Sequence, residues 1–342
     1  MRNKLRNIFF TIGFVAVVVM CFTFEVSFVE LWHDLLRAGY WLFAIFAMWG
    51  VLYFMNTCSW RIIIRGSGDC PISFWHLMKL TVTGFALNYA TPFGLLGGEP
   101  YKIVEMTPHI GAQRATSSVI LFSMMHIFAH FWYWVTAIVL YTVLSFVGEL
   151  SLGVGMQIIL VLMAMFCFFG IYLFVRGYKK GMVRRLVLLV GRIPFFKKSI
   201  NKFYTDHEED LVKIDSQISD LHNQKLGNFY AAFTIEYIGR ILQSFEIFFL
   251  LLIFGKDPTL INFMNAFLIL AFTSLFANLL FFFPLQLGGR EGGFVMSTVQ
   301  VGMANEIGIF ISIICRVREL FWVCIGLLFM MINADKKKRI EK

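Results

Sequence analysis

The sequence predicts an all-α polytopic membrane protein with six full spans and two re-entrant hairpins, about eight helices or more, arranged as an inverted repeat. Of the 342 residues, 58% are hydrophobic and only 15% are charged, against about 25% charged in ordinary soluble domains. Apolar runs able to cross hydrocarbon, which takes about 20 helical residues, recur from residue 8 to residue 332. We therefore expect a single membrane domain, 1–342.

The net charge of +9 does not indicate a nucleic-acid partner, because the Lys and Arg residues stand in short groups beside apolar runs. Such groups follow residues 60 and 175, and they also mark both ends of the chain. They predict a multi-pass protein of the bacterial inner (plasma) membrane with both termini in the cytoplasm. The expected full spans are 8–24, 41–60, 117–147, 153–175, 228–254 and 306–332.

The first span follows three basic residues, Arg2, Lys4 and Arg6. No small-x-small cleavage site follows the apolar run, so we interpret it as a retained span rather than a signal peptide. The six cysteines show no metal-ligand spacing and are interpreted as small core residues.

Two further apolar segments, 74–98 and 263–304, are not among these spans. The charge pattern on either side of each segment indicates whether it crosses the membrane or returns to the side from which it entered. Span 41–60 ends in the cytoplasm and span 117–147 must begin there, so 74–98 must enter and return on that side. The same reasoning makes 263–304 a hairpin from the opposite face. The halves 1–150 and 151–342 would then have opposite orientations, as in many transporters.

A short motif, P-x-x-L-x-G-x-E, occurs in each predicted hairpin. It runs from Pro92 to Glu99 and again from Pro284 to Glu291, with Asn88 and Asn278 preceding the two prolines. Helix-breaking residues in an apolar segment free backbone groups that lipid cannot satisfy, so such segments line cavities or are buried in protein. The alternative is tight hairpin packing in which the two glutamates cap helices.

The residues around each motif favour a site for a polar headgroup. Pro100 suits the first turn of a helix, whose amino end attracts phosphate or carboxylate. Glycines after Pro284 would let a headgroup approach the backbone closely.

Ionisable residues also stand deep inside three predicted spans. Glu236 and Arg240 are one helical turn apart in 228–254, and Arg316, Arg318 and Glu319 lie near the middle of 306–332. A charge at this depth costs several kcal/mol unless it is paired or hydrated. A functional site and a self-satisfied ion-pair network are both open interpretations.

Two histidines in span 117–147, His126 and His130, share one helical face. His126 follows Glu99 at the distance at which Arg318 follows Glu291, so the repeat extends beyond the motif. No further ligand residue lies near the pair in sequence, so we expect no metal site.

The stretches NYATPFGLLGGEPYK (88–102) and FPLQLGGREGG (283–293), with an Arg in the last span, resemble the lysylphosphatidylglycerol synthase transmembrane family, also called the flippase-like domain family. The resemblance covers essentially the whole chain and implies flipping of an aminoacylated or otherwise modified phospholipid. The family's aminoacyl-transferring domain has no counterpart here, so we expect a stand-alone member. Where members often carry an Arg-containing cluster after the first motif, this chain has His126 and His130.

The first part of the segment 176–226, up to residue 202, contains nine basic residues and no acidic residue. Apolar residues at heptad-like spacing follow. We expect it to lie on the anionic inner-leaflet surface. Docking of a cytosolic or membrane partner protein is the alternative.

The preferred interpretation is a cofactor-free transporter of a polar-headed, anionic or modified phospholipid or related amphiphile. The alternatives are a membrane-embedded lipid-modifying enzyme using Glu99 or Glu291 as general base, and a non-transporting subunit of a lipid or glycan assembly system. Arginines would hold the headgroup and glutamates would position it or pair with them. The expected site residues are Asn88, Pro92, Gly97, Gly98, Glu99, Lys102, His126, Glu236, Arg240, Asn278, Pro284, Gly288, Gly289, Arg290, Glu291, Arg316, Arg318 and Glu319.

Overall fold

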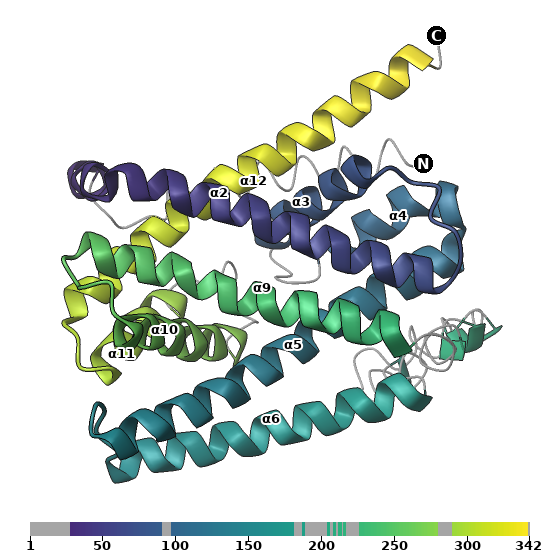
Figure 1. Ribbon diagram of the computed structural model, residues 1–342. Helices are drawn as coiled ribbons and strands as arrows, with labels where there is room; N and C mark the ends of the chain where they lie inside the picture. The colour runs from purple at the N-terminus through teal and green to yellow at the C-terminus, as the bar shows by residue number, and fades with distance from the viewer. Residues whose placement is uncertain are drawn as a thin grey trace.

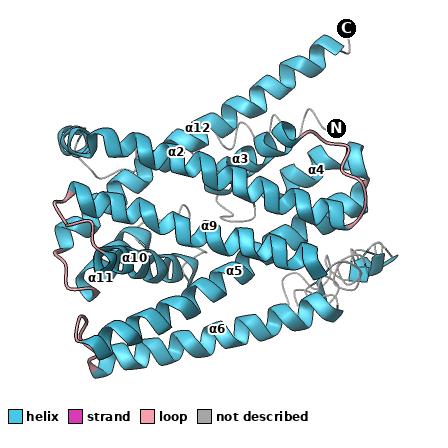
Figure 2. Ribbon diagram, viewed as in Figure 1, coloured by secondary structure: helices cyan, strands magenta, loops and turns pink. Residues whose placement is uncertain are grey.

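The computed structural model describes residues 28–90, 97–180, 187–188, 204–205, 208–209, 211–213, 215–216, 226–279 and 289–340. Every regular element that it assigns within these ranges is helical, as Figure 2 shows. The predicted span 8–24, most of the basic segment 176–226, and three expected site residues, Pro92, Pro284 and Gly288, lie outside the described residues.

Residues 28–147 form two long helices with two shorter ones between them, and a further long helix follows at the beginning of the predicted second half. These are α2 (Phe28–Gly66), α3 (Phe74–Ala90), α4 (Gly98–Ile110), α5 (Ala112–Val147) and α6 (Val154–Lys180). The second half again has two short helices between two long ones. These are α9 (Leu226–Ile253), α10 (Leu260–Leu279), α11 (Gly289–Gln300) and α12 (Asn305–Ile340).

Four of the described helices are long and apolar enough to cross a membrane: Leu36–Gly66, Ala112–Val147, Val154–Gly177 and Leu260–Leu279. The first three contain or overlap the predicted spans 41–60, 117–147 and 153–175. The fourth, α10, lies in the segment that was predicted to be a re-entrant hairpin. Helices α9 and α12 cover the predicted spans 228–254 and 306–332, but both carry several charged residues within their apolar stretches and are not among these four.

The outer helix α6 illustrates how the bundle meets lipid. It packs against α5, and its other side exposes large apolar side chains. Leu162 is 56% exposed and Phe168 is 65% exposed, which in water would make an unfavourable apolar surface. In a bilayer the same surface faces lipid tails, which are as apolar as the side chains, so its exposure is not unfavourable.

The helix contacts occur in matching pairs. Helices α2 and α9 pack along each other, α3 packs on α12 and α10 on α5; α3 contacts α4 as α10 contacts α11. In Figure 1, α3 and α4 lie at one end of the long helices, and α10 and α11 lie at the opposite end. Exchanging the two halves therefore reproduces the principal contacts.

Glycines make these contacts close. A Cβ on Gly326 of α12 would lie 2.5 Å from the Cβ of Ala86 on α3, and one on Gly308 would lie 2.7 Å from the backbone of α11. In the first half, a Cβ on Gly98 would lie 2.1 Å from the carbonyl oxygen of Gly84. Small residues that let backbones approach are how helices associate in lipid, where the hydrophobic effect gives no preference.

Candidate functional site

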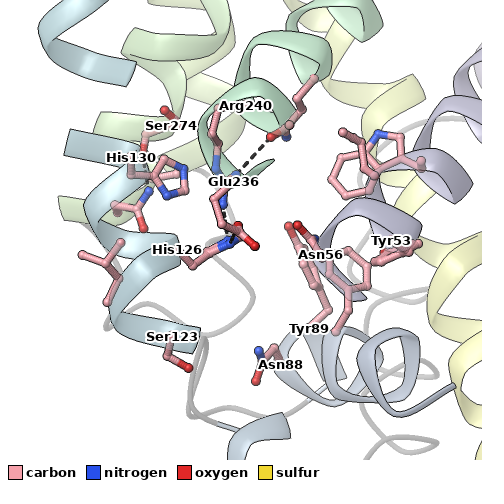
Figure 3. A pocket seen from close by; sticks show the side chains of 18 of the residues that line it. Tyr53, Asn56, Asn88, Tyr89, Ser123, His126, His130, Glu236, Arg240 and Ser274 are labelled. Carbon is pink, nitrogen blue, oxygen red and sulfur yellow. Dashed lines mark hydrogen bonds and ion pairs between the residues drawn. The ribbon is translucent and has the colours of Figure 1, made fainter. Parts of the chain in front are cut away.

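A cavity of about 290 Å³ lies inside the bundle and is lined by residues of α2, α3, α4, α5, α9, α10 and α11. Figure 3 shows side chains from separate helices converging on it. Aromatic residues Trp49, Tyr53, Phe85 and Tyr89 line one part, while ionisable side chains line another. Its volume is at the lower limit of ligand pockets, about 300–1,000 Å³, and therefore suits a small polar group.

The most buried acidic side chain in the cavity wall is Glu236 on α9, which is 2% exposed. Its Oε2 accepts a hydrogen bond from Nδ1 of His126 on α5 at 2.8 Å. Arg240, one turn further along α9, donates to Nε2 of the same imidazole and to Oε1 of Gln243 at 3.1 Å. Because a guanidinium can only donate, we assign Nε2 as the acceptor and Nδ1–H as the donor, which corresponds to a neutral imidazole.

The start of α4 forms a second polar group at the cavity. The side-chain oxygen of Asn88 accepts the backbone N–H of Gly98 at 2.6 Å, which satisfies one of the free donors of this helix end. Glu99 in the first turn accepts from Asn88 at 3.4 Å and pairs with Lys102 at 3.5 Å. Lys102 is 4% exposed, and its ammonium faces the ring of Phe122 at 5.2 Å.

Beside the cavity, three arginines and three glutamates form one ion-pair network. Arg290 pairs with Glu319 and donates to the hydroxyl of Tyr89 at 3.3 Å, which links the beginning of α11 to α3. Arg316 pairs with Glu291 at 2.7 Å and with Glu319 at 3.1 Å. Of these residues, only Arg290 and Tyr89 line the cavity.

The deepest pair of this network joins α12 to α9. Arg318, which is 0% exposed, donates to both carboxylate oxygens of Glu246 at 2.8 and 3.1 Å. The indole of Trp49 donates to Glu246 at 2.9 Å, and the guanidinium lies 3.8 Å from a ring centre of that Trp. Two fully buried charges are thus bonded on several sides, which is the arrangement that offsets their desolvation.

The expected site residues divide into those that line the cavity and those that do not. Glu291, Arg316, Arg318 and Glu319 belong to the network behind it, and Gly97, Gly98 and Gly289 form the beginnings of α4 and α11. The lining members are Asn88, Glu99, Lys102, His126, Glu236, Arg240, Asn278 and Arg290.

Sequence reasoning missed Glu246 and the aromatic residues Trp49, Tyr53 and Tyr89. Glu246 is a carboxylate inside an apolar run, and that same signal had singled out Glu236. The aromatic residues carry no such signal, because aromatic side chains are common throughout this sequence. In the described part of the chain, no three His, Cys, Asp or Glu residues are grouped as metal ligands.

Helices with an apolar outer face, enclosing a cavity with buried charges, define a polytopic membrane protein. Residues 8–326 match the family described as the lysylphosphatidylglycerol synthase TM region, and the chain belongs to this family. Membership confirms the resemblance inferred from the two glycine-rich stretches, and it ties this membrane domain to a lipid-related family. Neither a curated protein nor a solved structure matches the chain.

Proposed function

We propose that the chain binds a polar-headed membrane lipid in this cavity and carries the headgroup between the two leaflets. One observation carries the proposal: a headgroup-sized cavity with unpaired carboxylate oxygens lies inside a bundle whose outer face is apolar. Buried charges in apolar helices are costly, and proteins place them where a polar molecule passes or binds. Bilayer lipids are the polar molecules that surround such a bundle in the membrane.

The paired contacts support an inverted repeat as the basis of transport. Helices α3–α4 and α10–α11 lie at opposite ends of the bundle (Figure 1), and α2 and α9 meet in its centre. Two such halves can rock against one another about a site at their interface, which gives alternate access to each leaflet. The cavity receives residues from both halves, as that mechanism requires.

The function is tested with the purified chain in vesicles that contain headgroup-labelled phospholipids. We expect transfer of labelled lipid between leaflets without covalent change. Formation of a modified lipid would instead establish a membrane-embedded enzyme. Neither transfer nor product, with folded protein in the vesicles, would leave a non-transporting subunit and contradict the proposal.

Orientation provides a separate prediction. His109 at the end of α4 and Ala304 before α12 are both exposed, and the proposed repeat places them on opposite sides of the membrane. In a chain whose native cysteines are replaced by alanine, His109→Cys should react with an impermeant maleimide from the cytoplasm and Ala304→Cys from outside. Reaction of both variants from the same side would exclude opposed halves.

A further inference from the structure

Glu236 and Arg240 form no direct ion pair, which is unusual for two residues with this spacing. The two residues lie one turn apart on α9, a spacing at which a glutamate and an arginine ordinarily pair directly. Here His126 stands between them, accepting from Arg240 and donating to Glu236, and no ion pair joins the two charges. Figure 3 shows the imidazole beside the Glu236 side chain in the cavity.

Both charges therefore keep unused bonding capacity. Among the residues that the structure describes, Glu236 Oε1 is buried without a hydrogen-bond partner, and the partner of Oε2 is the imidazole of His126. In the described part of the chain, the hydrogen-bond partners of Arg240 are His126 and Gln243, which are both neutral. A buried carboxylate without a cation costs free energy, and a bound cation that donates hydrogen bonds would recover it.

From this geometry we propose that Glu236 and Arg240 form a split ion pair that binds a zwitterionic headgroup. The ammonium of the ligand donates to Glu236 Oε1 and its phosphate accepts from Arg240, while His126 is the positioning residue that keeps the two apart. The inference deepens the proposed function, since it names the headgroup class of the same cavity. It differs from the expectation of an anionic headgroup, since Arg290, Arg316 and Arg318 already have carboxylate partners.

Oε1 can only accept, so the ammonium must keep an N–H. A trimethylammonium group has the same charge and no donor, and its methyl groups would hold the nitrogen away from the oxygen. The cavity should therefore discriminate by the number of N–H donors on the headgroup. Tyr53, whose buried hydroxyl also lacks a partner, lines the same cavity and adds a donor or acceptor for the ligand.

Thermal unfolding of the purified chain in detergent measures this discrimination, since a ligand that binds the native state raises the melting temperature. The probes are phosphatidylethanolamine, its N-methyl and N,N-dimethyl derivatives, and phosphatidylcholine, all with the same acyl chains. We expect binding to weaken along the series, with phosphatidylcholine about tenfold weaker than phosphatidylethanolamine. Soluble O-phosphoethanolamine distinguishes a free headgroup from a lipid; we expect the lipid to stabilise more strongly.

Four variants show which residues produce the discrimination. Glu236→Gln and Arg240→Gln should each remove the preference within the series, and Glu149→Gln, at an exposed carboxylate outside the cavity, should retain it. His126→Ala should let Glu236 and Arg240 pair directly, so ligand stabilisation is lost while the melting temperature of the ligand-free protein does not fall. A merely structural histidine would lower that temperature.

Equal stabilisation by all four lipids, or the same preference in Glu236→Gln, would overturn the split ion pair. Such a result alongside measurable leaflet transfer would leave the proposed function intact. Selective binding without any transfer would have the opposite meaning: the headgroup site would stand and the transport function would fail. Greater stabilisation by phosphatidylglycerol, which is anionic, than by phosphatidylethanolamine would also overturn the inference.

Discussion

Replacing Arg318 by methionine should lower the free energy of unfolding by about 3–5 kcal/mol, because it leaves the carboxylate of Glu246 buried without its cation. Arg318 is 0% exposed and donates to both oxygens of Glu246. The measurement is thermal unfolding of the purified variant in detergent, taken beside its yield of folded protein. The effect should be a stability loss, since Arg318 lies behind the cavity and not in its wall.

Two further variants separate loss of an ion pair from loss of packing. Adding Glu246→Gln to Arg318→Met removes the uncompensated charge but keeps an acceptor for the Trp49 indole, so the double variant should recover much of the lost stability. Arg176→Met changes an exposed arginine of α6 and should cost little. A single Arg318→Met variant as stable as the parent chain would refute the structural role of this pair.

The helices that the sequence predicts are largely those that the structure contains, because apolar run length and charge placement are local signals. The predicted runs 41–60, 117–147 and 153–175 fall in helices that qualify as candidate spans. Run 263–304 was harder, since length and hydropathy describe α10 in the same way whether a helix spans or enters and returns. The family resemblance was also readable, because its motif residues are contiguous in the chain.

The repeat predicts that Glu99 and Glu291 are equivalent, and the structure gives them different partners. Glu99 lines the cavity and pairs with Lys102 three residues later. The corresponding position in α11 is Phe294, which offers no charge, and Glu291 pairs instead with Arg316 on α12. The two glutamates thus have different partners, a difference that the motif alone does not show.

The sequence could not predict which side chains pair with one another in the site. The spacing of Glu236 and Arg240 indicates a direct pair, yet His126 separates them, and its own chain position gives no sign of that contact. Such contacts depend on how α5 packs against α9, which follows from side-chain volumes along both helices rather than from any motif.

Filling the cavity should stop leaflet transfer, since the headgroup is proposed to pass through it. Ser123 lies on α5 one turn before His126, lines the cavity, and has a hydroxyl without a hydrogen-bond partner, so Ser123→Cys should preserve the fold. Benzyl methanethiosulfonate would attach an aromatic group to the thiol inside a space of about 290 Å³. We expect the labelled variant to transfer lipid no faster than protein-free vesicles.

The most direct test is the transfer rate of this variant before and after labelling, in the cysteine-free background. Transfer should stop on modification, resume when a reductant removes the group, and continue unchanged in labelled His109→Cys, whose thiol lies outside the cavity wall. Phosphatidylethanolamine should slow the labelling of Ser123→Cys. Complete modification with an unchanged transfer rate would contradict a headgroup path through this cavity.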